Sequence, residues 1–370
     1  MKGPRLTPLA ETLPASVPFV GPEAQERKLN QTFRARIGAN ESVFGPSPKA
    51  IAAMAKAASE TWMYGDPENH DLRHALAQSH DIQPENIIVG EGIDGLLGYL
   101  VRLLAGPGDA VVTSAGAYPT FNYHVAGFGA DLHMVPYVGD YEDPGALIAK
   151  TMEVNTKLIY FANPDNPMGT WHGRDVIEKM VGDVPDGCLL ILDEAYAQFL
   201  PPEDLPQIDP DHPRVIRMRT FSKAYGMAGA RVGYGIGAPD LITAFNKVRN
   251  HFGMPRISQA GALASLNDQD YLAEVIGKVA QAREEITEIA EQNGLTALPS
   301  MANFVTIDCG SDGDFARAVL AQLIARGVFV RMPFVAPQDR CIRISAGTPA
   351  DLAILAEALP QALEVARANL

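Results

Sequence analysis

A series of short β-prone runs, separated by helix-compatible stretches, constrains the fold more than any other feature of this sequence. The runs are almost entirely apolar, and strands that are apolar on both faces are typical of a parallel sheet covered by helices on each side. They lie at residues 87–89, 110–113, 132–135, 158–161, 188–192, 215–218 and 232–236. The pattern predicts an α/β fold with a mostly parallel seven-stranded sheet, in which ligands bind at the carboxyl ends of the strands.

The remaining sequence divides into an arm before this sheet and a second unit after it. Residues 1–48 are rich in Pro, Gly and polar side chains, which is typical of an extended arm with turns. Residues 49–240 then form the large domain. After residue 240, long helical patterns with a few strand-like runs predict a smaller α+β domain at 241–370, and we expect the arm to pack with it.

Charge and cysteine content exclude several classes of function. The 370 residues include 30 Lys and Arg against 44 Asp and Glu, a net charge of −14, which argues against nucleic-acid and membrane-surface partners. Cys188, Cys309 and Cys341 are far apart and lack CxxC spacing, so we expect no disulfide framework and no metal site. A reducing, cytoplasmic location fits best. No stretch approaches the ~18 apolar residues of a membrane span.

Three loops at expected strand ends concentrate unusual polar residues. The sequence NPDNPMG at 163–169 forms a rigid turn that would fix the side chain of Asn166. Asp193 ends the apolar run LLILD, where a buried carboxylate must be paired or hydrogen-bonded. The third loop begins at Thr220 and contains Ser222, Lys223 and Arg231.

Together these loops meet the chemical needs of pyridoxal phosphate. A lysine amine forms a Schiff base with a carbonyl, hydroxyls with an arginine suit a phosphate dianion, and a buried carboxylate can keep a pyridine nitrogen protonated. The strand end LILDE also imitates the magnesium-binding carboxylate of nucleotide hydrolases. That hypothesis requires a GxxxxGK[ST] loop, which this sequence lacks.

The sequence resembles the fold type I pyridoxal-phosphate aminotransferases of classes I and II, within them the branch that contains histidinol-phosphate aminotransferase. The resemblance covers almost the whole chain. It depends on six motifs in the family's order, namely ANESVFGPSP, YGDPE followed by LRHALA, NPDNPMG, DEAY, TFSKAYGMAGARVGY, and VRMP with CIRISAG. It implies an enzyme that moves an amino group from a small-molecule donor to a 2-oxo acid.

The resemblance also implies roles for residues around the cofactor ring. Lys223 would bind the cofactor covalently and later carry a proton as general acid and base. Asp193 would pair with the ring nitrogen, and Asn166 and Tyr196 would hydrogen-bond its phenolic oxygen. Tyr118 matches the aromatic side chain that stacks on the ring.

The cofactor phosphate would be held by residues from two chains. Main-chain amides at Gly92, Ile93 and Asp94 would contact it where a strand turns into a helix. Thr220, Ser222 and Arg231 would complete this phosphate cup. Tyr64 resembles the tyrosine that reaches the same phosphate from the neighbouring subunit, which implies a homodimer.

The substrate residues implied by the resemblance are Arg343, Arg331 and Phe19. Arg343 matches the arginine that clamps the substrate's acidic group, and Arg331 matches a second arginine that helps bind a substrate phosphate. Phe19 replaces a tyrosine whose hydroxyl commonly helps bind that phosphate. Ile93 and Gly95 also depart from the usual GADE or GSDE loop. An aromatic amino-acid aminotransferase therefore remains an alternative substrate assignment.

Two further alternatives stay open on the sequence alone. A decarboxylase of the threonine-phosphate type would use the same lysine, aspartate and arginine but break a different bond of the substrate. A catalytically idle domain that serves as a binding module would need a partner domain, and the chain retains all the catalytic positions. We expect transamination rather than either alternative.

Overall fold

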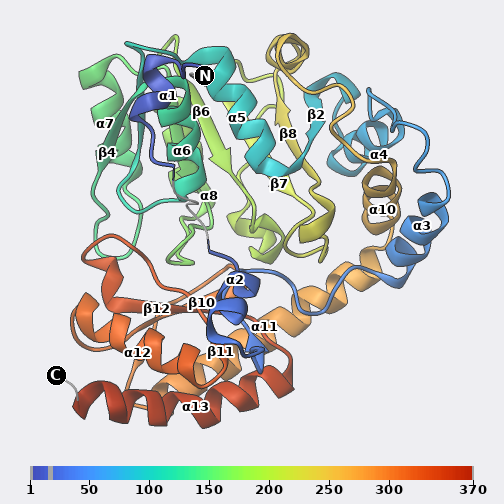
Figure 1. Cartoon of the computed structure of the whole chain (residues 1–370). Coiled ribbons are helices and arrows are strands. Elements are labelled where there is room, and N and C mark those ends of the chain that lie inside the picture. Colours follow the sequence, from blue (N-terminus) through green and yellow to red (C-terminus); the bar gives the residue numbers. More distant parts are fainter. Residues whose placement is uncertain (1–2, 16–19, 369–370) are drawn as a thin grey trace.

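Seven strands form the central sheet of the larger part of the molecule, seen in the computed structural model, which describes residues 3–15 and 20–368 (Figure 1). The strands are β2 (Ile87–Gly90), β3 (Ala110–Ser114), β4 (Asp131–Val135), β5 (Leu158–Ala162), β6 (Leu189–Asp193), β7 (Val215–Thr220) and β8 (Gly233–Gly237). Their spatial order is β2-β8-β7-β6-β5-β3-β4, and only β8 runs antiparallel to its neighbours. The predicted α/β fold with a mostly parallel seven-stranded sheet is confirmed.

Helices cover both faces of this sheet, because successive side chains of each strand point to opposite sides. Leu158 and Tyr160 of β5 pack among side chains of α5 and α6, whereas Ile159 and Phe161 pack among those of α7 and α8. The helices of the described residues are α1 (Pro8–Thr12), α2 (Pro22–Leu29), α3 (Pro48–Ala58), α4 (His70–His80), α5 (Gly92–Leu104), α6 (Pro119–Phe128), α7 (Pro144–Val154), α8 (Arg174–Asp183), α9 (Pro239–Ala244), α10 (Arg256–Leu266), α11 (Gln269–Gln292), α12 (Gly313–Ala325) and α13 (Pro349–Ala368). Within these ranges, no helix is both long and apolar enough to cross a membrane.

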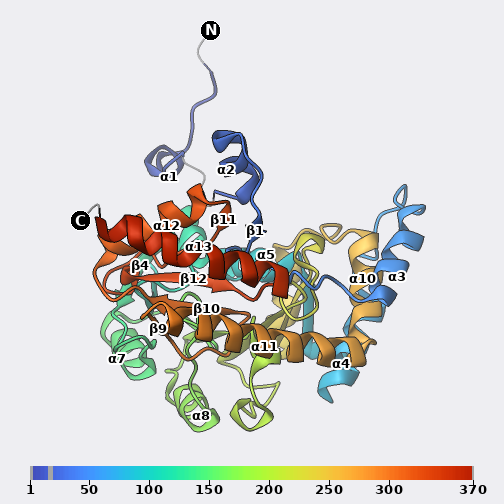
Figure 2. The same ribbon diagram turned by 90° about the horizontal axis from the view of Figure 1, so that it is seen from below.

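Two small sheets lie below the central one (Figure 1). One has the order β12-β10-β9, from Cys341–Ser345, Phe304–Asp308 and Thr296–Ala297. In the other, β1 (Ala35–Arg36) of the N-terminal segment pairs in parallel with β11 (Val328–Phe329). Helices α12 and α13 lie against each other on the outer side of these sheets (Figure 2).

Helix α11 connects the two parts of the molecule. Its buried residues recur every three or four positions, as in Leu272, Val275, Val279 and Ile286, so one face of the helix joins the hydrophobic core. The preceding helix α10 packs against α3 and α4, beside the central sheet (Figure 1). Because α10 lies with the larger part, we propose that the division between a large and a small domain falls within α11, later in the chain than residue 240.

Candidate active site

A cavity of about 320 Å³ opens at the carboxyl ends of β5, β6 and β7. A second cavity, of about 450 Å³, shares Asp94, Tyr118, Asn166 and Lys223 with the first. The sequence-predicted residues that line the first are Ile93, Asp94, Tyr118, Asn166, Asp193, Tyr196, Thr220, Ser222, Lys223 and Arg231, and the second adds Arg331 and Arg343. Residues more than 200 positions apart in the sequence thus meet in one cleft.

Asp193 is the last residue of β6 and is almost fully buried beneath the first cavity. Its Oδ1 accepts a hydrogen bond from the Ala195 amide at 2.9 Å, and its Oδ2 accepts one from the Tyr160 hydroxyl at 2.6 Å. Burial raises the pKa of Asp193 to about 6, although both hydrogen bonds act to lower it. Above this pH the carboxylate is mainly charged and can pair with a protonated nitrogen of a ligand.

Lys223 follows β7 in a tight loop, and its Nζ donates a hydrogen bond to the main-chain oxygen of Asn40 at 3.1 Å. Burial, together with the charges of Arg343 and Arg231, lowers the pKa of Lys223 to about 8. Lowering an amine pKa toward neutrality increases the fraction of the uncharged, nucleophilic form. Lys223 is thus the amine in this cavity prepared for attack on a carbonyl carbon.

Asn40 was missed by the sequence reasoning as an individual residue, although it belongs to the motif ANESVFGPSP. Its Nδ2 donates to the Tyr196 hydroxyl at 3.1 Å, and its Oδ1 accepts from Ser345 Oγ at 3.1 Å. The residue has a positive φ of 56° and is 2% exposed. Asn40 therefore ties the N-terminal segment, β12 and Lys223 together at the cavity wall.

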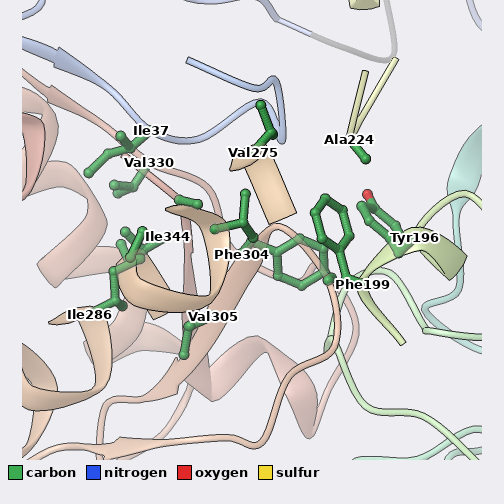
Figure 3. Close-up of a cluster of buried hydrophobic side chains, with 14 of the residues drawn as sticks. Ile37, Tyr196, Phe199, Ala224, Val275, Ile286, Phe304, Val305, Val330 and Ile344 are labelled. Atoms are coloured by element: carbon green, nitrogen blue, oxygen red, sulfur yellow. The ribbon is translucent and has the colours of Figure 1, made fainter. Parts of the chain in front are cut away.

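Tyr196 is oriented by the hydrophobic core as well as by Asn40. Its ring meets that of Phe304 edge to face, with centroids 5.5 Å apart and planes at 87°. Figure 3 shows both rings in the cluster of buried side chains that also contains Phe199 and Val275. Phe304 belongs to β10, so the small three-stranded sheet supports a residue of the cleft.

The sequence-predicted phosphate cup is formed where β2 ends and α5 begins. Gly92 has a φ of 77°, a backbone conformation that favours glycine, and a Cβ atom there would lie 2.6 Å from Nη2 of Arg231. The Ser222 amide donates to Thr220 Oγ1 at 3.0 Å, and Arg231 Nη1 donates to Ser222 Oγ at 3.5 Å. A helix N-terminus, two hydroxyls and a guanidinium thus converge, which is the donor set that an anion requires.

The two candidate substrate arginines lie on adjacent backbone segments. The amide of Arg343 donates to the carbonyl of Arg331 at 2.6 Å, and both side chains line the second cavity. Arg343 Nη1 donates to Asn166 Oδ1, whereas its buried Nε has no hydrogen-bond partner among the described residues. A guanidinium that lines a cavity and keeps unused hydrogen-bonding capacity is suited to a carboxylate ligand.

The structure does not bring Tyr64 into the cleft. Tyr64 is 76% exposed, lies against Phe252 with ring centroids 4.8 Å apart, and lines neither of the two cavities. Phe19 lies outside the described residues. Within the residues that the structure describes, no group of three or more His, Cys, Asp or Glu side chains could hold a metal ion.

The sequence matches the family "Aminotransferase class I and II" over residues 36–359. The chain belongs to this family. This class I/II aminotransferase is 32% identical over 343 residues to histidinol-phosphate aminotransferase 2 of Pseudomonas fluorescens, with 92% of each chain covered. It also resembles a crystal structure of histidinol-phosphate aminotransferase from Sinorhizobium meliloti in complex with pyridoxal-5'-phosphate, at 51% identity and a TM-score of 0.95, covering 98% and 99% of the two chains.

A second solved structure shares only the fold with this aminotransferase. L-threonine-O-3-phosphate decarboxylase of Porphyromonas gingivalis is 19% identical, with a TM-score of 0.76 and coverage of 89% and 99% of the two chains. At this identity the likeness gives no information on which bond of a substrate is broken.

Proposed function

We propose that the protein is a pyridoxal-phosphate-dependent aminotransferase of the histidinol-phosphate type, which passes an amino group from a donor to a 2-oxo acid in two stages. One observation carries this proposal. Asp193 and Lys223 line a single cavity of about 320 Å³ together with most residues of the predicted phosphate cup, and this is the set of groups that the cofactor's chemistry calls for.

The donor set of the first cavity fits pyridoxal phosphate. Asp193 would hold the ring nitrogen, Asn166 and Tyr196 would face the phenolic oxygen, and Tyr118 would lie against the ring. The phosphate would occupy the cup formed by residues 92–94, Thr220, Ser222 and Arg231, with Gly92 leaving the space that a Cβ atom would fill. When bound, the cofactor supplies an electron sink for the bonds of the substrate's α-carbon.

Lys223 would carry out the proton transfer. Its amine would hold the cofactor and, when free, would take the proton from the substrate's α-carbon. The lowered pKa of about 8 suits a general base that operates near neutral pH. Asn40, whose carbonyl accepts the hydrogen bond of Nζ, orients this amine.

The second cavity supports a donor with an acidic or phosphorylated side. Arg343 would bind the acidic group of the substrate, and Arg331 would add a second positive charge where that group is a phosphate. Both arginines line the same cavity, and this arrangement favours histidinol phosphate over a neutral aromatic donor. The contribution of Phe19 stays a prediction.

The exposed aromatic side chains support a homodimer. Trp62, Tyr64 and Phe252 are 82%, 76% and 55% exposed. Burying such side chains in a subunit interface would remove a large apolar area from water and would place Tyr64 near the phosphate cup of the partner. We also propose a cytoplasmic location, in line with the three cysteines being free and buried.

A visible absorption titration tests the proposed reaction. Cofactor-loaded protein is titrated with histidinol phosphate and with aromatic, acidic and aliphatic amino acids, and Lys223→Ala serves as the control. We expect histidinol phosphate to bleach the band of the lysine-bound cofactor and a 2-oxo acid to restore it, with neither change in Lys223→Ala. Release of carbon dioxide without consumption of an oxo acid would instead identify a decarboxylase.

A further inference from the structure

Tyr160 is a buried residue of β5 that none of the roles above uses. Its hydroxyl donates a hydrogen bond of 2.6 Å to Oδ2 of Asp193, and its ring stacks on Phe121 with centroids 4.7 Å apart and planes at 17°. The side chain is 1% exposed and forms part of the wall of the first cavity. A phenylalanine would satisfy the stacking equally well, so the hydroxyl serves the carboxylate.

The register of the sheet places this hydroxyl beside the carboxylate. Strands β5 and β6 are parallel, with Ala162 opposite Asp193 and Tyr160 opposite Ile191. Residues two apart on a strand share a face, so Tyr160 and Asp193 project to the same side as diagonal neighbours. Both the strand pairing and the Phe121 stack therefore fix the direction from which the hydroxyl approaches.

Few groups act on Asp193 in this pocket. Among the described residues, its carboxylate accepts hydrogen bonds from the Ala195 amide and the Tyr160 hydroxyl, so Tyr160 is its side-chain donor. The charged or ionisable groups that interact with it electrostatically are Lys223, Glu194, Tyr118, Tyr160 and Tyr196. Of these, Lys223 would be bonded to the cofactor in the loaded enzyme, whereas Tyr160 is held by the strand pairing and the Phe121 stack.

We propose that Tyr160 is a positioning residue for Asp193. The Tyr160 hydroxyl holds Oδ2 of Asp193 and makes the carboxylate a weaker base, so that the shared proton stays on the cofactor's ring nitrogen. This inference rests on the proposed function, because it assigns Asp193 to that nitrogen. When two bases share one proton, the stronger base holds it. A hydrogen bond donated to a carboxylate stabilises its charged form and so makes it the weaker base.

The first test uses the protein without cofactor and therefore does not depend on activity. The infrared band of the protonated Asp193 carboxyl, identified by its loss in Asp193→Asn, is followed against pH in wild type and in Tyr160→Phe. Removing a hydrogen bond to a charged group should raise the pKa of Asp193 by about one unit. Tyr234→Phe is the matched control, since it removes another buried hydroxyl, which bonds His80 at 2.9 Å outside both cavities.

The second test measures the protonation of the cofactor's ring nitrogen in the loaded enzyme. With pyridoxal phosphate labelled with ¹⁵N, the ring-nitrogen shift of Tyr160→Phe should move toward the unprotonated value. The rate of the first half-reaction should fall about tenfold, the size expected for one hydrogen bond to a charged group. Replacement Tyr160→3-fluorotyrosine makes the phenol a stronger donor and should shift both the Asp193 titration and the nitrogen signal in the opposite direction.

These outcomes separate the inference from the proposed function. If wild-type protein fails to bind the cofactor, the proposed function is wrong, while the titration of Asp193 still tests the Tyr160 contact. If the cofactor binds but Tyr160→Phe and 3-fluorotyrosine leave the Asp193 pKa and the nitrogen shift unchanged, the role of Tyr160 is overturned. If circular dichroism shows that Tyr160→Phe does not fold, the fluorotyrosine variant alone tests the role of the Tyr160 hydroxyl.

Discussion

The cofactor end and the substrate end of the cleft are built in different ways. At the cofactor end, Asp193 and the phosphate cup stand on strand ends of one sheet and are hydrogen-bonded within the same chain. At the substrate end, Phe334 is 72% exposed, and Arg331 Nη2 donates to the carbonyl of Val20 in the N-terminal segment. The first region is therefore built mainly on the central sheet, with Asn40 as a contact from the N-terminal segment. The second depends more strongly on segments distant in sequence and, in our proposal, on the partner subunit.

The largest effect should come from Asp193→Asn, which changes the cofactor end. Asparagine keeps the shape but cannot hold the ring nitrogen protonated, so we expect kcat to fall about 10³-fold, as for the loss of a preorganised electrostatic contact. Because this end does not contact the distal part of the substrate, the loss should be equal for histidinol phosphate and for an aromatic donor. Steady-state kinetics with both donors measure it, and a donor-dependent loss would contradict the separation of the two ends.

A buried ion cluster in the sheet beneath the cofactor end should contribute strongly to the stability of the fold. Glu194 is 2% exposed and contacts Arg217 at 2.9 Å and Arg219 at 2.8 Å. Glu194→Gln leaves both arginines without a charge partner, which should lower the free energy of unfolding by about 3 kcal/mol. Urea unfolding measures this loss, and Glu357→Gln, which removes an exposed pair with Arg34, should have no measurable effect.

The ion pairs of Glu194 with Arg217 and Arg219 should also make the stability of the fold depend on pH in a defined direction. Although burial acts in the opposite direction, the charges of Arg217 and Arg219 lower the pKa of Glu194 from 4.5 to about 2. Because the pKa of Glu194 is lower in the folded state than in the unfolded state, its charge stabilises the fold at pH values above about 4.5. This contribution is lost as the pH falls from about 4.5 to about 2. Glu194→Gln should therefore lose less stability than wild type across this range, and equal slopes would contradict the assignment.

The cofactor end was also the more predictable region. An apolar run that ends in an acid predicts a buried carboxylate at a strand end, and Lys223 follows the next strand along the chain. These signals are local, so the sequence alone indicates them. The cleft does bring both residues together, and the predicted sheet is confirmed.

The contacts that sequence reasoning missed join distant segments. Tyr160 lies in an apolar run, and its approach to Asp193 follows from the pairing of β5 with β6. Asn40 acts through Lys223 and Ser345, which are 183 and 305 positions away. Local patterns contain no information on such pairings.

A smaller effect, limited to one class of donor, is expected at the substrate end. Arg331→Gln keeps hydrogen-bonding capacity but removes the charge, so kcat/KM for histidinol phosphate should fall about 30-fold, equivalent to about 2 kcal/mol from a charge-assisted hydrogen bond. An aromatic donor without a phosphate should change less than threefold. A comparison of kcat/KM for the two donors measures this selectivity. An equal loss for both would show that Arg331 supports the fold and does not bind the substrate phosphate.

The smallest effect should distinguish a site completed by two chains from one completed within a single chain. Tyr64→Phe removes one hydroxyl, so the affinity for pyridoxal phosphate should fall about fivefold, in line with about 1 kcal/mol for a neutral hydrogen bond. The structure gives Tyr64 no place in the cavities of its own chain, so this loss should appear only in the dimer. Mixing Tyr64→Phe with Lys223→Ala subunits creates dimers in which the intact Lys223 site receives the intact Tyr64. Cofactor affinity at that site should return to the wild-type value, and its failure to do so would place the effect of Tyr64 within its own chain.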